Sequence, residues 1–161
     1  MSLAPRLQDY LSRNGASFDL VTHPRSHWSI ETADLADIPG DKLVKSVVLK
    51  DDEGVVVAVL PSTRSVHIGH LSTELDRRLR LADEEDLQPA FPDCSPGAIP
   101  PVPAAYGIRA LVDDSLEAAQ EVYFEAGDHE TLVHMTASQF FALLGNAPRV
   151  HFGVGERRRI R

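Results

Sequence analysis

Residues 42–61 read KLVKSVVLKDDEGVVVAVLP, and this stretch decides the fold. Two valine-rich runs, Val44–Lys50 and Val55–Leu60, flank the segment Asp51-Asp52-Glu53-Gly54. β-Branched side chains favour extended backbone, and acidic residues followed by glycine favour a turn. The stretch therefore predicts a β-hairpin. Its second run is apolar at every position, which indicates a strand covered on both faces of the sheet.

One lysine falls on the apolar side of the first predicted strand. In an extended chain, Lys45 shares a face with Val47 and Leu49, because side chains alternate between the two faces. Lysine is rarely buried without a partner. Two interpretations stay open from this geometry: either Lys45 lies at the strand end and extends its ammonium group to water, or it belongs to a functional site.

The composition is that of a folded protein in a single domain, residues 1–161. Its hydrophobic content of 43% and charged content of 25% are ordinary for a globular protein. Helical and extended patterns are interspersed without strict alternation, which predicts an α+β fold with a mixed sheet surrounded by helices. No membrane-spanning run or signal peptide is visible, and Cys94 is the only cysteine. We expect a cytoplasmic protein with no membrane partner and a spectator thiol.

Charge and motifs exclude several classes of function. The formal net charge of −8 argues against a protein that coats nucleic acid, although local basic patches remain compatible with binding one end of it. The seven histidines never present three ligands on one face, so we expect no metal and no cofactor. The chain contains neither a nucleotide-phosphate loop nor a G-x-S-x-G motif.

Periodicity and caps predict the remaining elements. Helices are predicted over residues 3–14, from Ser26 or Ser29 to before Pro39, and over 68–79, 83–89 and 136–144. Strands are predicted over 17–22, 79–82, 107–112, 121–125 and 131–135. Residues 62–67 are predicted to be irregular, and 148–161 to form a strand and a loose tail. Five prolines in Phe91–Pro103 predict a stiff loop, and long loops in compact domains are often functional.

Three features follow one another in a specific order: Lys45 in its strand, the loop Gly97-Ala98-Ile99-Pro100-Pro101, and the turn Gly127-Asp128-His129. Together with the Thr22-His23-Pro24 segment and Ala58–Pro61, they resemble the YbaK/ProX family. These are free-standing relatives of the editing domain of bacterial prolyl-tRNA synthetase. The resemblance covers about residues 22–144 and leaves residues 146–161 as an extension.

The resemblance implies an aminoacyl-tRNA deacylase, which hydrolyses the ester that joins a wrong amino acid to the 3′ end of tRNA. It implies a partly closed mixed sheet and no metal. Lys45 would be the catalytic residue and would position the tRNA end by its charge. A backbone N–H of Gly97 or Ala98 would stabilise the developing oxyanion, with Ile99, Pro100 and Pro101 as scaffold.

The resemblance also assigns Gly127, Asp128 and His129 to the amino-acid pocket, with Asp128 facing the α-ammonium group of the substrate. The alternative for Asp128 is a turn residue that binds its own backbone. Residues 25–28, Arg-Ser-His-Trp, are expected to help to set the amino acid accepted.

A second function stays open beside the enzyme. The same fold would serve as a non-catalytic module that recognises an aminoacyl or nucleotide end, as a regulator or as a partner of a synthetase. The net charge of −8 favours this alternative mildly, because it weakens independent tRNA affinity. The sequence leaves open whether water or a ribose hydroxyl attacks, and whether the protein is a monomer or a weak dimer.

Overall fold

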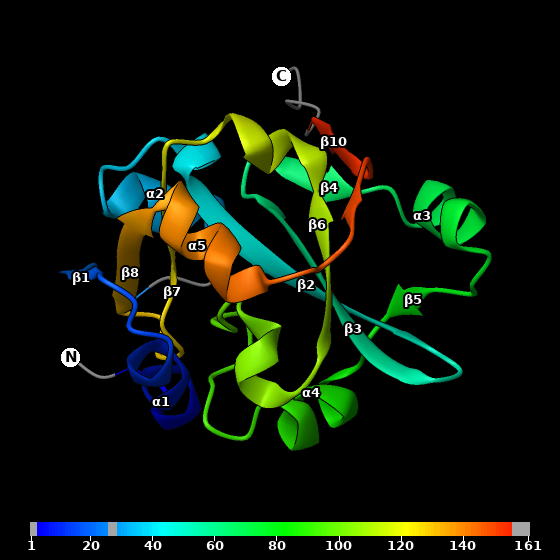
Figure 1. Cartoon of the computed structure of the whole chain (residues 1–161), viewed down its shortest axis with the longest axis horizontal. Helices are drawn as coiled ribbons and strands as arrows, with labels where there is room; N and C mark the ends of the chain where they lie inside the picture. The colour runs from blue at the N-terminus through cyan, green and yellow to red at the C-terminus, as the bar shows by residue number, and fades with distance from the viewer. Residues whose placement is uncertain (1–2, 26–28, 156–161) are drawn as a thin grey trace.

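The computed structural model describes residues 3–25 and 29–155 (Figure 1). The α-helices are α1 (Pro5–Arg13), α2 (Ser29–Leu35), α3 (Ile68–Leu75), α4 (Glu84–Ala90) and α5 (Ala137–Leu144), and three 3-10 helices are η1 (Gly40–Lys42), η2 (Pro103–Tyr106) and η3 (Asp114–Ala118). The strands are β1 (Asp19–Thr22), β2 (Leu43–Asp51), β3 (Gly54–Pro61), β4 (Arg64–Val66), β5 (Arg80–Leu81), β6 (Arg109–Asp113), β7 (Glu121–Glu125), β8 (Thr131–Thr136), β9 (Arg149–Val150) and β10 (Gly153–Gly155). No helix in the described ranges is long and apolar enough to cross a membrane.

The predicted hairpin forms the centre of the main sheet and crosses the molecule as its longest pair of strands (Figure 1). The strand order is β1-β8-β7-β2-β3-β6-β9, with β5 also paired to β2. The β2–β7, β3–β6 and β6–β9 pairs are parallel and the others are antiparallel, so the sheet is mixed, as predicted. β3 is buried from Val56 to Pro61, as its unbroken apolar sequence predicts.

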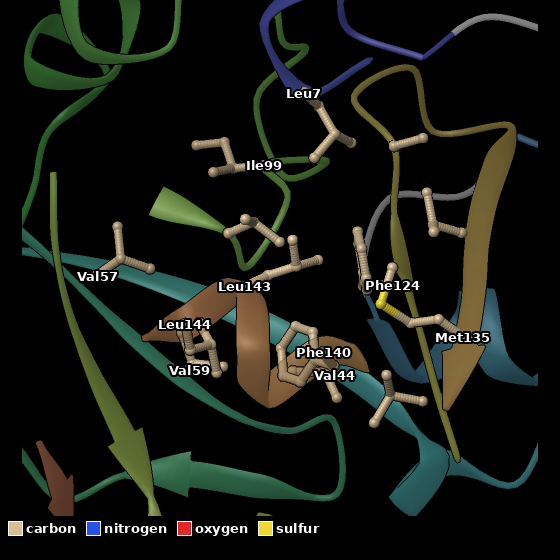
Figure 2. Close-up of a cluster of buried hydrophobic side chains, with 14 of the residues drawn as sticks. Leu7, Val44, Val57, Val59, Ile99, Phe124, Met135, Phe140, Leu143 and Leu144 are labelled. Atoms are coloured by element: carbon tan, nitrogen blue, oxygen red, sulfur yellow. The ribbon is translucent and has the colours of Figure 1, made fainter. Parts of the chain in front are cut away.

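The two faces of the sheet carry different cores. One face packs on α1, α5 and the proline-rich loop in a large cluster that includes Val44, Phe124 and Phe140 (Figure 2). The opposite face carries two smaller clusters. Leu49, Leu60 and Leu71 belong to the cluster under α3, and Ala33, Leu43 and Leu132 belong to the cluster under α2.

Lys45 lies between these two smaller clusters. Along its face of β2, Leu43 belongs to the cluster under α2 and Val47 packs against the cluster under α3. The lysine therefore interrupts an apolar surface where one cluster ends and the other begins. This arrangement explains how a charged residue fits on the apolar side of a central strand.

Two predictions about local structure were wrong in detail. Residues 62–67 contain β4, which pairs with β10 from Arg64–Gly155 to Val66–Gly153, a long-range contact that local sequence does not reveal. Helix α3 ends at Leu75, because Asp76 adopts left-handed backbone with φ 52°. Leu79 reaches the same cluster from the segment that follows the helix. Helix α4 ends at Ala90, as predicted from the proline beside it.

Two predicted segments lie outside the described residues: Ser26-His27-Trp28, expected to set the amino acid accepted, and the arginine-rich tail at 157–161.

Candidate functional site

Lys45 lies at a break in the sheet. β2 pairs with β7 at Leu43 and Val44, and with β5 at Leu49 and Lys50. Between these two ladders, the strand pairing of β2 on that edge is interrupted, and the carbonyl oxygen of Val48 accepts a hydrogen bond of 3.0 Å from the amide of Ala82. The side chain of Lys45 is half-buried, and its Nζ lies 3.5 Å from the carbonyl oxygen of Ser62. The ammonium group therefore lies near the end of β3, on the side of β2 away from this edge.

The proline-rich loop and the turn at 126–130 are bonded to each other. The amide of Ser95 donates a hydrogen bond of 2.8 Å to the carbonyl oxygen of Gly127. The Nε2 atom of His129 bonds the carbonyl oxygen of Pro96, and because a carbonyl only accepts, this nitrogen carries the hydrogen. Two of the three features that the sequence singled out therefore meet in space.

The turn that carries His129 has a strained backbone. His129 has a left-handed φ of 64° although its side chain is buried, which is uncommon for a residue with a Cβ. Gly127 has a φ of 119°, and a Cβ at this position would lie 3.0 Å from Cβ of Ala4. Strain of this kind concentrates at functional sites, where the surrounding structure holds it.

Asp128 is engaged by its own turn. Its Oδ1 atom accepts hydrogen bonds from the amides of Glu130 (2.9 Å) and Thr131 (2.8 Å), and Oδ2 accepts one from the hydroxyl of Thr131 (3.0 Å). These are the contacts of a turn residue that binds its own backbone. They favour the structural alternative for Asp128 over the binding of a substrate ammonium group.

The glycine-proline loop is anchored by burial. Ala98, Ile99 and Pro100-Pro101 are buried, and Ile99 packs into the large cluster. The amide of Ala98 already donates to the carbonyl oxygen of Ser95 at 3.0 Å. Gly97 is exposed, with a φ of 81°. Of the two amides predicted to meet an oxyanion, the one on Ala98 is occupied by this turn, which leaves Gly97 as the candidate donor.

A buried polar cluster on the Lys45 face escaped the sequence analysis. Glu125 is 8% exposed and His23 is 6% exposed. The Oε1 atom of Glu125 accepts a hydrogen bond of 3.2 Å from the hydroxyl of Thr32 and lies 3.4 Å from Nε2 of His23. The backbone amide of His23 donates to the carbonyl oxygen of Glu130, which fixes the cluster to the turn at 126–130.

The strand register places Glu125 abreast of Lys45. β2 and β7 run parallel, with Leu43 opposite Tyr123 and Val44 opposite Phe124. One residue further along both strands come Lys45 and Glu125, so their side chains leave the sheet on the same face. The sequence carried one signal for this position. Side chains alternate along a strand, so Glu125 shares a face with Tyr123, which packs against the cluster under α2.

Burial raises the pKa of Glu125 to about 7. The electrostatic interaction with His129 and the hydrogen bond from Thr32 oppose this rise in pKa, whereas the charge of Asp128 adds to it. A carboxyl group with this pKa is divided between its neutral and ionised forms near neutral pH. Perturbed carboxyl groups of this kind gather at functional sites.

Cys94 is not a nucleophile in this structure. Its Sγ lies 3.1 Å from the hydroxyl of Tyr106, and burial raises the pKa of the thiol to about 12. The reactive form of cysteine is the thiolate, which this site disfavours. The structure therefore agrees with the prediction of a spectator thiol.

One cluster of metal-ligand residues occurs among the described residues: Asp113, Asp114 and His151. Asp113 is fully buried, and its Oδ1 atom accepts hydrogen bonds from the amides of Phe152 (2.9 Å) and Gly153 (2.7 Å). These bonds attach the end of β6 to the start of β10. They give the carboxylate a structural role that needs no ion.

The model of the aminoacyl-tRNA editing domain matches residues 23–143. The chain belongs to the aminoacyl-tRNA editing domain family. No curated protein matches the sequence with significance. Lys45, the proline-rich loop, the turn at 126–130 and the Glu125 cluster all lie within the matched range.

Solved structures share the fold. A protein proposed to be a trans-editing enzyme for prolyl tRNA synthetase superposes with a TM-score of 0.82 at 24% identity, over 96% of this chain and 100% of that chain. The hypothetical protein APE2540 superposes with a TM-score of 0.81 at 19% identity, over 92% and 99%. A protein from Marinobacter aquaeolei VT8 described as a candidate for signal transduction gives 0.75 at 23%, over 95% of this chain and 31% of its own.

Proposed function

We propose that the protein is an aminoacyl-tRNA deacylase that hydrolyses the ester of mischarged tRNA and so serves translation quality control. Membership of the editing-domain family supports an editing function. The observation that carries the proposal is the position of Lys45. Its side chain is half-buried, and Lys45 directly follows the residues of β2 that pair with β7, level with the end of β7, from which the turn bonded to the proline-rich loop begins.

In this proposal the ammonium group of Lys45 binds the tRNA end, and a backbone amide of the proline-rich loop stabilises the transition state. The ammonium group of Lys45 holds the phosphate or ribose of the terminal adenosine, because a fixed positive charge attracts both the phosphate and the hydroxyl oxygens. Water or the neighbouring ribose hydroxyl attacks the ester carbonyl, and negative charge develops on its oxygen. The amide of Gly97 donates to this oxyanion, and the buried prolines keep it in place. When water attacks, the tetrahedral intermediate expels the 3′ oxygen of the ribose, which takes up the proton that the water loses, and the free amino acid is released. When the neighbouring ribose hydroxyl attacks first, the amino acid moves to that hydroxyl, and water then hydrolyses the new ester in the same way.

The partner of this reaction is the 3′ end of a mischarged tRNA, and a synthetase is a candidate second partner. We assign the protein to the cytoplasm, where aminoacyl-tRNA is used. We assign it no metal and no cofactor in this reaction, because the groups named above supply both the positive charge and the oxyanion donor.

The experiment offers the purified protein a panel of tRNAs that each carry a wrong amino acid, and follows release of the amino acid. A deacylase releases at least one amino acid far faster than the uncatalysed ester decays. The non-catalytic module is the second candidate, favoured by the net charge of −8. It binds aminoacyl-tRNA in a filter assay and releases nothing from any member of the panel.

A further inference from the structure

One oxygen of the buried Glu125 carboxyl group is unused. Its Oε1 atom faces the hydroxyl of Thr32 and the ring of His23, whereas Oε2 is buried and accepts no hydrogen bond from the described residues. A buried carboxylate oxygen without a donor is costly, because it has lost water and gained nothing in exchange. A site of this kind is satisfied when a ligand supplies the donor.

The ring of His23 is oriented by its other nitrogen. Nδ1 lies 2.7 Å from the carbonyl oxygen of Pro24, which only accepts, so Nδ1 carries a hydrogen. In the neutral ring, Nε2 then presents a lone pair to Oε1 of Glu125 at 3.4 Å. The two atoms form no hydrogen bond, so Nε2 of His23 is, like Oε2 of Glu125, a buried polar atom without a hydrogen-bond partner among the described residues.

The surroundings of Glu125 define the chemistry that fits it. The carboxyl group lies at the end of β7, abreast of Lys45 and immediately before the strained turn that carries His129. Asp128, the other carboxylate of this region, has its oxygens bonded within the turn. In the candidate site, the Oε2 atom of Glu125 is therefore the carboxylate oxygen that can accept a hydrogen bond from a ligand.

We propose that Glu125, through Oε2, binds the α-ammonium group of the aminoacyl ester, so that the protein requires a free α-amino group on its substrate. This inference rests on the proposed function for the identity of the ligand, but it concerns recognition and not hydrolysis. The positive charge of the bound ammonium group compensates the negative charge of the buried carboxylate, and its N–H supplies the donor that Oε2 lacks. Thr32 is a positioning residue, because its hydroxyl donates to Oε1 and thereby aims Oε2.

The test uses two matched sets of adenosines whose 3′ position carries a small amino acid through an amide bond, which is not hydrolysed. One set has a free α-amino group and the other is N-acetylated at that group. Equilibrium binding to the wild-type protein should be weakened by acetylation by about 10- to 100-fold, as expected for loss of a hydrogen bond between charged groups. The Glu125→Gln variant should bind both sets alike, at the weaker affinity.

Glu121→Gln is the matched control. It makes the same chemical change four residues earlier on the same strand, at a side chain that is 39% exposed and pairs with Lys42 at 3.7 Å. This variant should keep the wild-type preference for the free α-amino group.

Two results would overturn the proposal: equal binding of free and acetylated analogues by the wild type, or an undiminished preference in Glu125→Gln. Failure of every free-amine analogue to bind would also overturn it. The proposed hydrolysis fails separately. A protein that prefers the free-amine analogues and releases nothing from mischarged tRNA retains the Glu125 site and is not a deacylase.

Discussion

Replacing Glu125 by glutamine should change how the stability of the protein depends on pH. Burial raises the pKa of Glu125 from 4.5 to about 7 on folding. A carboxyl group of this kind stabilises the folded state fully below pH 4.5, where it is protonated in both states, and the stabilisation is lost as the pH rises through 7. Glutamine has a similar shape, keeps an oxygen for the hydroxyl of Thr32, and does not ionise.

The two pKa values give the magnitude. Between pH 5 and pH 8 the unfolded chain ionises Glu125 almost completely, whereas the folded protein does so only near the upper limit. The linkage relation then gives a loss of about 2.5 kcal/mol in the free energy of unfolding of the wild type over this interval. The Glu125→Gln variant escapes this loss, so its stability relative to wild type should rise by the same amount.

Urea unfolding followed by circular dichroism at pH 5, 6, 7 and 8 measures this difference. Comparing two proteins at each pH cancels the titration of groups that do not interact with residue 125. Glu121→Gln serves again as the control, and its difference from wild type should stay small across the series because its side chain is partly exposed. A difference between Glu125→Gln and wild type that stays constant within about 0.5 kcal/mol from pH 5 to pH 8 refutes the reasoning.

Three further predictions concern the supports of the site and the absence of a metal requirement. Gly127→Ala should lower the free energy of unfolding in urea by about 1–3 kcal/mol, because φ is 119° and the new Cβ would meet Ala4; an unchanged urea midpoint would contradict this. Asp113→Asn should lower the free energy of unfolding in urea by about 1–3 kcal/mol, because an amide cannot accept every hydrogen bond that the carboxylate accepts. The control is Asp114→Asn at the exposed neighbouring residue, which should change this free energy by no more than about 0.5 kcal/mol. Deacylation should survive chelation and dialysis at full rate, and loss of activity that zinc restores would show that a metal takes part.

The elements fixed by local chemistry were predictable from the sequence. Valine-rich runs around Asp51–Gly54 gave the hairpin, and the cap at Thr136 with the glycine at 145 gave the limits of α5. In each case the signal lies within a few residues of the structure that it specifies. Strand β4 was not predicted, because the structure that specifies it is distant in sequence. Its partner β10 lies near the other end of the chain and contributes two glycines, which carry no strand pattern.

Site residues that belong to a recognisable sequence pattern could be predicted. Residues whose chemistry depends on being buried in the folded protein could not. Lys45 stood out because it interrupts an alternating apolar strand. Glu125 also alternates with its neighbours, but a glutamate at the end of a strand is normally exposed, and only the packing of Thr32 and His23 around it reveals a buried carboxyl group. For Asp128 the sequence left two roles open, substrate binding and a turn residue that binds its own backbone, and only the structure shows the bonds within the turn.

Single-turnover release of an amino acid from mischarged tRNA by Lys45 variants tests the central claim most directly. Lys45→Ala should melt within a few degrees of wild type and lose most of its deacylation rate, because small displacements of the ester cost orders of magnitude. Lys45→Arg should restore little, since arginine keeps the charge but is longer and planar. Lys50→Ala, which removes the same charge at the far end of β2, should release the amino acid at the wild-type rate. A Lys45→Ala protein that melts and deacylates like wild type would contradict the account.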